Sequence, residues 1–144
     1  SNARAQGPRA DPYYTDLVAT PLETGISWQR RVQIEGSFQK LAAGGHLSVL
    51  QMHDGKVDPN VLTNASKEIL QEDLGFYTFT RDVSFCSQCR SVLSGLKRKC
   101  PECGSSTTLT HFARLTAKYQ PIRWWEDVDR ELISRRQSYD FEVK

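Results

Sequence analysis

The stretch CSQCRSVLSGLKRKCPECG, residues 86–104, holds all four cysteines of the chain as two Cys-x-x-Cys pairs. Each pair, Cys86 with Cys89 and Cys100 with Cys103, places two thiolates on one tight turn of backbone. Two such turns facing each other supply the four sulfur ligands that Zn²⁺ prefers, and the ten residues between the pairs suffice for a short hairpin. We therefore predict a structural zinc site, with two disulfides or a redox or iron–sulfur site as the alternatives.

Length and composition set bounds on the rest of the chain. A chain of 144 residues with 38% hydrophobic content can bury one small core, and zinc binding can add on the order of 10 kcal/mol to its folding. Ser1-Asn2-Ala3 resembles a remnant of tag cleavage, and the polar, proline-containing residues that follow are typical of a loose arm. We expect residues 1–11 to be this remnant and arm, and residues 12–144 to form a single domain.

The charge balance and the apolar runs exclude some classes of protein. Nineteen basic and seventeen acidic residues give a net charge of +2, which argues against a dedicated nucleic-acid binder. No run approaches the roughly 18 apolar residues that would cross a membrane, and no signal peptide is visible. Reduced, metal-bound cysteines suit the cytosol, so a cytoplasmic protein is expected.

The hydrophobic pattern predicts a small α+β domain of helices and short strands, with the four-cysteine zinc ribbon near the C-terminus. Asp58-Pro59 is typical of a helix start, and Gly36 interrupts the first expected helix. Glycines at 95 and 104 permit sharp turns around the cysteine pairs. The expected elements are helix 26–43, strand 46–52, a helix from Asp58 that Gly75 ends, strand 76–85, strand or hairpin 107–119, and helix 126–138.

Other side chains could bind a ligand, but each of them is explained more simply by packing or by exposure to solvent. The three histidines are scattered and are expected to be surface or satisfied residues. The basic run could touch phosphate but is better explained as a solvated loop, and the tryptophans could stack on a ligand but favour packing. These candidates are His46, His53 and His111, the run Lys97-Arg98-Lys99, and the pair Trp124 and Trp125.

The order of several short motifs resembles the C-terminal end of the anaerobic (class III) ribonucleoside-triphosphate reductases, which are glycyl radical enzymes. The similarity covers about Pro12 to Tyr139 and rests on shared order and spacing. The motifs are Pro12-Tyr13-Tyr14-Thr15, Phe38-Gln39-Lys40-Leu41, Gly44-Gly45-His46, Phe76-Tyr77-Thr78-Phe79, Cys100-Pro101-Glu102-Cys103-Gly104-Ser105 and Arg114-Leu115-Thr116-Ala117-Lys118-Tyr119-Gln120-Pro121-Ile122, followed by Trp125, Arg136 and Tyr139.

One position departs from this family. The resemblance implies that the glycine of the family's Arg-x-x-Gly-Tyr motif, which carries the stored radical, is replaced by Ala117, and that the following aromatic residue is replaced by Lys118. The four cysteines match only the family's zinc ligands, so no catalytic residue is expected in this chain. We expect the segment from Arg114 to Pro121 to pack near the zinc knuckle, with the zinc stiffening its base.

The resemblance implies partners as well as a fold. They are the reductase catalytic barrel, in cis or in trans, and a radical-SAM activating enzyme. The family reaction reduces ribonucleoside triphosphates to deoxyribonucleotides, and this chain alone is expected not to perform it. The alternative hypothesis is a stand-alone zinc-ribbon interaction module that binds a protein partner, or nucleic acid through Lys97, Arg98, Lys99 and the tryptophans.

Overall fold

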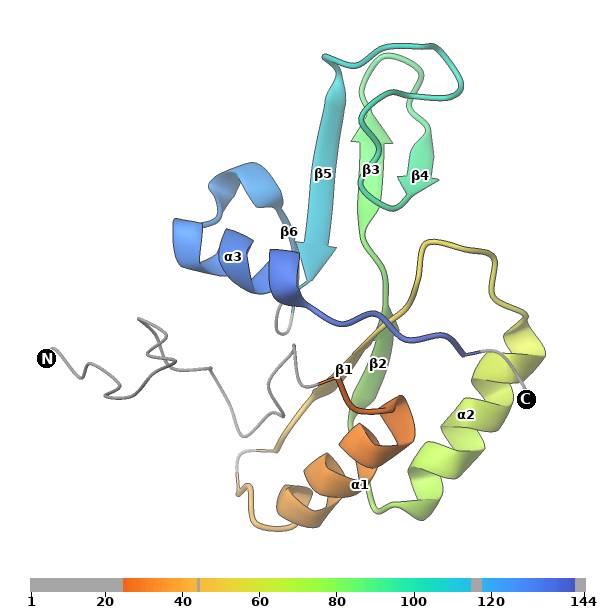
Figure 1. Ribbon diagram of the computed structural model, residues 1–144, viewed down its shortest axis with the longest axis vertical. Helices are drawn as coiled ribbons and strands as arrows, with labels where there is room; N and C mark the ends of the chain where they lie inside the picture. The colour runs from red at the N-terminus through yellow and green to blue at the C-terminus, as the bar shows by residue number, and fades with distance from the viewer. Residues whose placement is uncertain (1–24, 44, 115–117, 142–144) are drawn as a thin grey trace, which may run out of the picture.

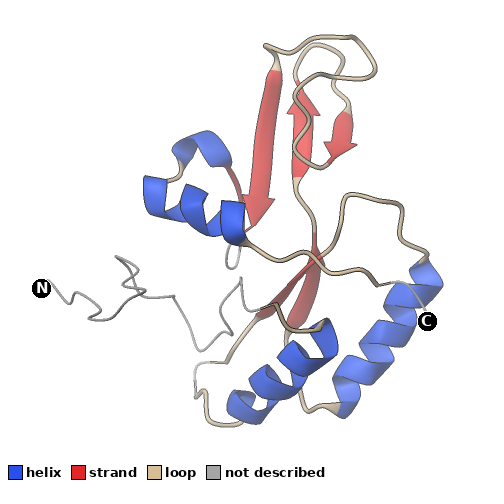
Figure 2. Cartoon of the chain, in the orientation of Figure 1, coloured by secondary structure: helices blue, strands red, loops and turns tan. Residues whose placement is uncertain are grey.

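The computed structural model describes residues 25–43, 45–114 and 118–141, which form two small sheets with three α-helices around them (Figure 1). The expected arm, residues 1–11, lies outside the described residues. The mixture of helices and short strands confirms the predicted α+β class (Figure 2). The elements are α1 (Trp28–Gln39), β1 (Ser48–Gln51), α2 (Pro59–Gln71), β2 (Tyr77–Thr80), β3 (Val83–Cys86), β4 (Val92–Ser94), β5 (Leu109–Arg114), β6 (Tyr119–Pro121), the 3-10 helix η1 (Ile122–Trp124) and α3 (Asp127–Arg135).

The first sheet consists of β1 and β2, which pair in parallel and are connected through α2. The start of α2 was correctly predicted, because the Asp58 side chain accepts a hydrogen bond from the Asn60 backbone N–H and Pro59 occupies the first turn. The helix ends at Gln71, before the predicted stop at Gly75. Asp73 then adopts a left-handed φ of 58°, a conformation that Asp tolerates better than most residues.

The glycine inside α1 has a packing role. Gly36 is buried where α1 meets the end of α2, and a Cβ atom at this position would lie 2.1 Å from the Glu72 carbonyl oxygen. The residue that weakened the helical pattern therefore allows two helices to approach closely. The helix begins after Ser27, whose hydroxyl accepts from the Arg30 N–H, and it ends at Gln39 rather than at the predicted residue 43.

The C-terminal end of the chain completes the core of the first sheet. After α3, which ends at Arg135 instead of the predicted residue 138, the chain runs extended and returns to β1. The Tyr139 N–H donates to the Gln51 carbonyl at 2.8 Å, and the ring centroids of Phe141 and Phe79 lie 5.0 Å apart. The buried core residues are Val32, Leu50, Ala65, Ile69, Leu74, Tyr139 and Phe141.

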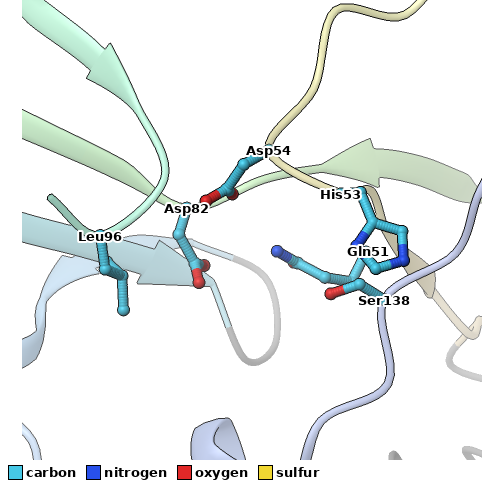
Figure 3. A pocket seen from close by; sticks show the side chains of 6 residues that line it. All are labelled: Gln51, His53, Asp54, Asp82, Leu96 and Ser138. Carbon is cyan, nitrogen blue, oxygen red and sulfur yellow. The ribbon is translucent and has the colours of Figure 1, made fainter.

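The predicted strand from Phe76 to Phe85 is wrong as a single element. It is divided into β2 and β3, which belong to different sheets. The division falls at Arg81 and Asp82, where backbone groups bond to a side chain and a turn instead of a neighbouring strand. Figure 3 shows the Asp82 side chain at this junction. The Arg81 carbonyl accepts from the Tyr119 hydroxyl at 2.9 Å, and the Asp82 carbonyl accepts from the Gly95 N–H at 2.8 Å.

The second sheet is antiparallel, in the order β4-β3-β5-β6, and it carries the cysteines at one end. Cys86 ends β3 and pairs in register with Leu109 at the start of β5. The short strand β4, which the hydrophobic pattern did not predict, pairs with β3 and leads toward the second cysteine pair. The ribbon therefore extends away from the first sheet, with the cysteines at its far end (Figure 1).

Candidate metal centre

Each Cys-x-x-Cys pair closes a tight turn with similar backbone geometry. In the second pair the Gly104 N–H donates to the Cys100 carbonyl at 2.9 Å, and Gly104 has a φ of 75°. The residue in the same place after the first pair is Arg90, with a φ of 60°, so only the second turn uses a glycine for this conformation.

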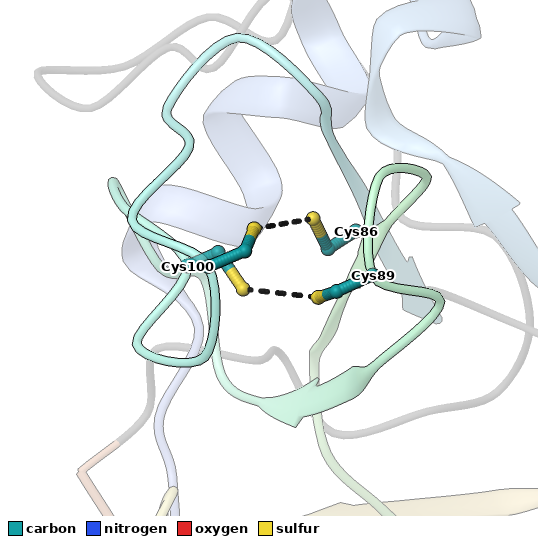
Figure 4. A group of neighbouring side chains, drawn as sticks. Cys86, Cys89 and Cys100 are labelled. Carbon is teal, nitrogen blue, oxygen red and sulfur yellow. Dashed lines mark hydrogen bonds between the residues drawn. The ribbon is translucent and has the colours of Figure 1, made fainter.

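The four cysteine sulfurs gather into one cluster (Figure 4). All four Sγ atoms lie within 4.8 Å of one another, and 3.6 Å separates Cys86 from Cys103 and Cys89 from Cys100. A disulfide needs about 2.05 Å, so these distances do not fit the alternative of two disulfides, and all four cysteines are free. Four sulfurs at ~2.3 Å around a tetrahedral Zn²⁺ stand about 3.8 Å apart, which agrees with the observed spacing. The cluster fits a tetrahedral zinc ion.

The thiols differ in how readily they ionise. A hydrogen bond from the Thr108 hydroxyl, with backbone N–H donors of the first turn, lowers the pKa of Cys86 to about 6. The Cys103 backbone N–H lowers the pKa of Cys100. The Ser105 N–H lowers the pKa of Cys103, but partial desolvation and the neighbouring cysteine sulfurs outweigh it and raise that pKa to about 12. Without a cation the cluster cannot hold four thiolates at neutral pH, and a divalent metal would remove this conflict.

The histidines lie apart from the cysteines, and each has a polar partner. His46 is buried, with Nε2 at 3.2 Å from Oε2 of the Glu35 carboxylate, whose other oxygen, Oε1, lies 2.9 Å from Nε of buried Arg31. His111 contacts the Ser84 hydroxyl at 2.9 Å through Nδ1, and exposed His53 lies 3.6 Å from Asp140. These positions agree with their interpretation as surface or satisfied residues.

The basic run is exposed, but only one of the two tryptophans is exposed with it. Lys97, Arg98 and Lys99 are exposed between β4 and the second turn, as expected for a solvated loop. Trp125 is buried, with 7% of its surface exposed, whereas Trp124 is 69% exposed. Only one of the two indole rings is therefore available to stack on a ligand.

Arg114 at the end of β5 pairs in register with Tyr119 at the start of β6, so the two residues flank the segment that contains position 117. We call this pair of residues the bracket. Ala117 itself lies outside the described residues. The Arg114 guanidinium donates to the Thr78 hydroxyl at 3.1 Å, and the Tyr119 hydroxyl contacts the Thr80 hydroxyl at 2.7 Å. Both ends of the bracket are thus held on β2.

The expectation that Arg114 to Pro121 packs near the zinc knuckle is wrong for its described residues. The six-residue strand β5 starts beside Cys86 and ends at Arg114, about 17 Å away at the usual rise of a strand. The bracket is not a free tail, because β6 pairs with β5, but it lies at the junction with the first sheet. The rigid β5 strand separates it from the cysteines (Figure 1).

Arg136 supports this bracket, although the sequence pattern assigned it no role beyond the family resemblance. Its guanidinium donates to both Asp82 carboxylate oxygens, at 2.7 and 2.8 Å, and to the Arg114 carbonyl at 2.9 Å. Both side chains are largely buried, and such charge-assisted hydrogen bonds are stronger than neutral ones. An arginine inside the predicted last helix and an aspartate inside a predicted strand were the only sequence features at these positions, and neither indicates its partner.

Comparison with protein families identifies the lineage of the chain. A family model described as anaerobic ribonucleoside-triphosphate reductase matches residues 2–139. The chain belongs to this family. No curated protein gives a significant match. Among the residues that the structure describes, no helix is long and apolar enough to cross a membrane.

Solved structures of anaerobic ribonucleotide reductases share the fold of this family member. One, titled "Anaerobic ribonucleotide reductase", matches with a TM-score of 0.63 and 22% identity over 76% of this chain and 17% of its own length. Two from Thermotoga maritima, one in complex with dATP and CTP and one with glycerol in the active site, match at TM-scores of 0.59 and 0.58. Both are 17% identical to the chain over 81% of its length, and the match covers 18% and 17% of their own. The chain thus spans less than a fifth of these reductases.

Proposed function

We propose that this chain is a zinc-stabilised positioning module of an anaerobic ribonucleoside-triphosphate reductase. Zn²⁺ held by Cys86, Cys89, Cys100 and Cys103 would stabilise the far end of the ribbon. The bracket formed by Arg114 and Tyr119 would present position 117 to a catalytic barrel, in the same protein or in a partner. The family reaction is the reduction of ribonucleoside triphosphates to deoxyribonucleotides, and we propose that this chain does not perform it alone.

The observation that carries this proposal is the anchoring of the bracket. Side chains of β2 form hydrogen bonds with both Arg114 and Tyr119. Arg136, which is paired with Asp82, also donates to the Arg114 carbonyl. These contacts would fix the positions of Arg114 and Tyr119, and so the two points between which position 117 is presented. A segment that must meet a partner with defined geometry benefits from this preorganisation.

The proposal includes the absence of a stored radical at position 117. A glycyl radical is planar at its α-carbon and is flanked by two amide groups, with no side chain to clash. Ala117 has one α-hydrogen and a methyl group, so the activating enzyme of the family would meet a different steric setting. No cysteine outside the zinc cage is present to pass a radical to a substrate.

The experiment combines the chain anaerobically with a reductase catalytic barrel, a radical-SAM activating enzyme, S-adenosylmethionine and a reductant. We expect a stable complex with the barrel by size-exclusion chromatography and no glycyl doublet by electron paramagnetic resonance. A doublet from the unmodified chain would show that another glycine carries the radical. Failure to bind any barrel, with zinc bound and the fold intact, would refute the positioning role.

The reverse substitution tests the assignment of position 117 directly. The double variant A117G/K118Y restores both family residues, and we expect it to gain the doublet when the barrel is supplied. Ala113→Gly places a glycine at a buried position of β5 and is the matched control, which should remain silent. A silent double variant that still binds the barrel would contradict the assignment.

The alternative module that binds nucleic acid keeps one supporting observation, the exposed Trp124 beside Arg123, whose guanidinium lies 5.7 Å from its ring. Fluorescence titration with single-stranded oligonucleotides at increasing salt discriminates between the two functions. Affinity that falls steeply with salt and is lost in Trp124→Ala would favour this alternative. We expect no such binding.

A further inference from the structure

The two turns of the cysteine cluster contact each other through their sulfur atoms. The Cys89 and Cys100 sulfurs lie 3.6 Å apart, and so do those of Cys86 and Cys103, so each contact joins a residue of one turn to a residue of the other (Figure 4). Each contact also joins an exposed cysteine to a buried one. Removal of two electrons would let either contact close to a disulfide, in which the sulfurs are about 2.05 Å apart.

The two contacts differ in the charges beside their exposed cysteine. Cys89 is followed by the exposed Arg90, and the exposed run Lys97-Arg98-Lys99 precedes the second turn. Cys103, the exposed cysteine of the other contact, instead follows the exposed carboxylate of Glu102. Reactive thiolates are accessible and lie in electropositive surroundings. Cations also stabilise the hydroxide ion that leaves a peroxide, so these charges favour oxidation at Cys89.

We propose that the Cys89–Cys100 pair is a site of reversible oxidation by hydrogen peroxide, which closes a disulfide across the two turns and releases the zinc. The Cys89 thiolate attacks one peroxide oxygen, so that an S–O bond forms, the O–O bond breaks and hydroxide leaves. The Cys100 thiolate then attacks the Cys89 sulfur, so that an S–S bond forms, the S–O bond breaks and a second hydroxide leaves. The two thiolates together lose two electrons, and both hydroxide ions take up protons from water.

Closure of this disulfide removes two of the four zinc ligands. A metal ligand must be a thiolate, so only Cys86 and Cys103 would remain able to hold the ion. An incomplete cage loses most of the binding free energy, and the zinc leaves. The disulfide keeps the two turns joined, so a reductant can restore the site. This inference rests on the zinc site of the proposed function and adds a chemical control to it.

A hydroxyl group lies beside each contact, which allows the two contacts to be distinguished. The Ser91 hydroxyl is 2.9 Å from the Cys89 sulfur, and the Thr108 hydroxyl is 3.3 Å from the Cys86 sulfur. A thiolate has no proton, so each hydroxyl donates to its sulfur in the zinc-bound cluster. A donated hydrogen bond stabilises the thiolate and lowers its nucleophilicity. Ser91 therefore restrains attack by Cys89, whereas Thr108 acts on the other contact.

The test adds hydrogen peroxide to the zinc-loaded wild-type chain and follows zinc release with a chromogenic chelator. We expect about one zinc ion to be released for each peroxide consumed, and zinc binding to return after treatment with dithiothreitol. Trypsin cleaves after Arg90 and after Lys99, which separates the two cysteine pairs. The proposed disulfide therefore joins two tryptic peptides, and their fragmentation by mass spectrometry identifies the joined sulfurs.

Two variants that keep all four cysteines test which sulfur reacts. Ser91→Ala should release zinc about threefold faster or more, the effect expected when one hydrogen bond to the reacting sulfur is lost. Thr108→Val is the matched control, because it removes the hydroxyl beside Cys86, and it should react at the wild-type rate. Equal rates for the two variants would overturn the assignment to Cys89.

The remaining outcomes separate this inference from the metal site itself. Zinc that stays bound in excess peroxide would overturn the proposal, as would a disulfide within one turn or between Cys86 and Cys103. Zinc loss that dithiothreitol does not reverse would overturn it as well. A folded wild-type chain that binds no zinc with four reduced thiols would instead refute the zinc site on which the proposal rests.

Discussion

At the scale of single residues, the four thiols are equivalent in type but differ in environment. Cys86 and Cys100 are buried at the base of the cluster, whereas Cys89 and Cys103 are exposed. Zinc binding needs all four as thiolates, and an incomplete cage loses most of the binding free energy. The metal site therefore depends on each cysteine, although they contribute differently to the core.

Changing any one of Cys86, Cys89, Cys100 and Cys103 to Ser is expected to abolish stoichiometric zinc binding and partly unfold the ribbon. Metal analysis should give about one zinc per wild-type chain. Ser91→Ala is the control, because it removes a hydroxyl 2.9 Å from the Cys89 sulfur but keeps four ligands, so zinc should remain. A wild-type protein that stays folded without metal and with four reduced thiols would contradict the zinc site.

The affinity for zinc should rise with pH. Cys103, with a pKa raised to about 12, carries a proton at neutral pH and must release it to bind metal, whereas Cys86, at about 6, is largely ionised already. Each released proton increases the affinity by about tenfold per pH unit. Competition with a zinc chelator between about pH 6.5 and 8 measures this slope. An affinity that is independent of pH would show that all four thiols are already ionised.

At the scale of elements, close approaches decide where helices and strands can lie. The α1 helix passes the end of α2 only because position 36 has no side chain. The bracket at the end of β5 is held by a few hydrogen bonds, among them those of the largely buried Arg136–Asp82 pair. Both features predict selective effects of single substitutions.

Gly36→Ala is expected to destabilise the protein by about 1–3 kcal/mol, although Ala is the better helix former. The added methyl group meets the Glu72 carbonyl oxygen, which belongs to backbone and cannot rotate away. Urea unfolding followed by circular dichroism measures the change. Ser37→Ala, an exposed neighbour in α1, should stay within about 0.5 kcal/mol of wild type. Equal stability of Gly36→Ala would mean that α1 and α2 pack differently.

Arg136→Lys is expected to loosen the bracket without loss of zinc. Lysine cannot donate from one rigid fork to both the Asp82 carboxylate and the Arg114 carbonyl. Amide hydrogen exchange at β5–β6 should accelerate, while metal content and exchange around the cysteines stay unchanged. Arg135→Lys, whose partner Glu131 is exposed on the same helix, serves as the control. Zinc loss in Arg136→Lys would couple the bracket to the metal site instead.

At the scale of the whole molecule, the last described residues hold the first sheet together. Phe141 and Tyr139 fill the core that α1, α2 and β1 leave open, and Phe141 contacts the rings of both Trp28 and Phe79. The chain therefore closes its core with residues more than a hundred positions away from α1. The same C-terminal part of the chain includes α3 and Arg136, which pairs with Asp82 between the two sheets.

Phe141→Ala is expected to lower the free energy of unfolding by about 3–5 kcal/mol, because a buried ring is removed from a packed core. The residue is 4% exposed in the folded chain. Phe76→Ala removes the same ring at a position that is 64% exposed and should cost much less. Denaturant unfolding compares the two. Similar losses would show that the C-terminal residues do not pack in the core.

The sequence by itself determined the local features that depend on neighbours in the chain. The two Cys-x-x-Cys pairs indicated the cluster, Asp58-Pro59 indicated the start of α2, and the motif order indicated the family. In each case a short spacing constrains the backbone or the ligand geometry directly. Such signals need no knowledge of what packs against them.

Only the tertiary structure decided features that depend on distant partners. The break between β2 and β3 follows from Tyr119 and Gly95, which supply the hydrogen bonds that a continuous strand would have used. The bracket lies far from the zinc because β5 runs the length of the ribbon before it meets β6. Burial of Trp125 instead of Trp124 likewise follows from contacts between segments far apart in sequence. Periodicity reports which face is apolar, but not which partner will cover it.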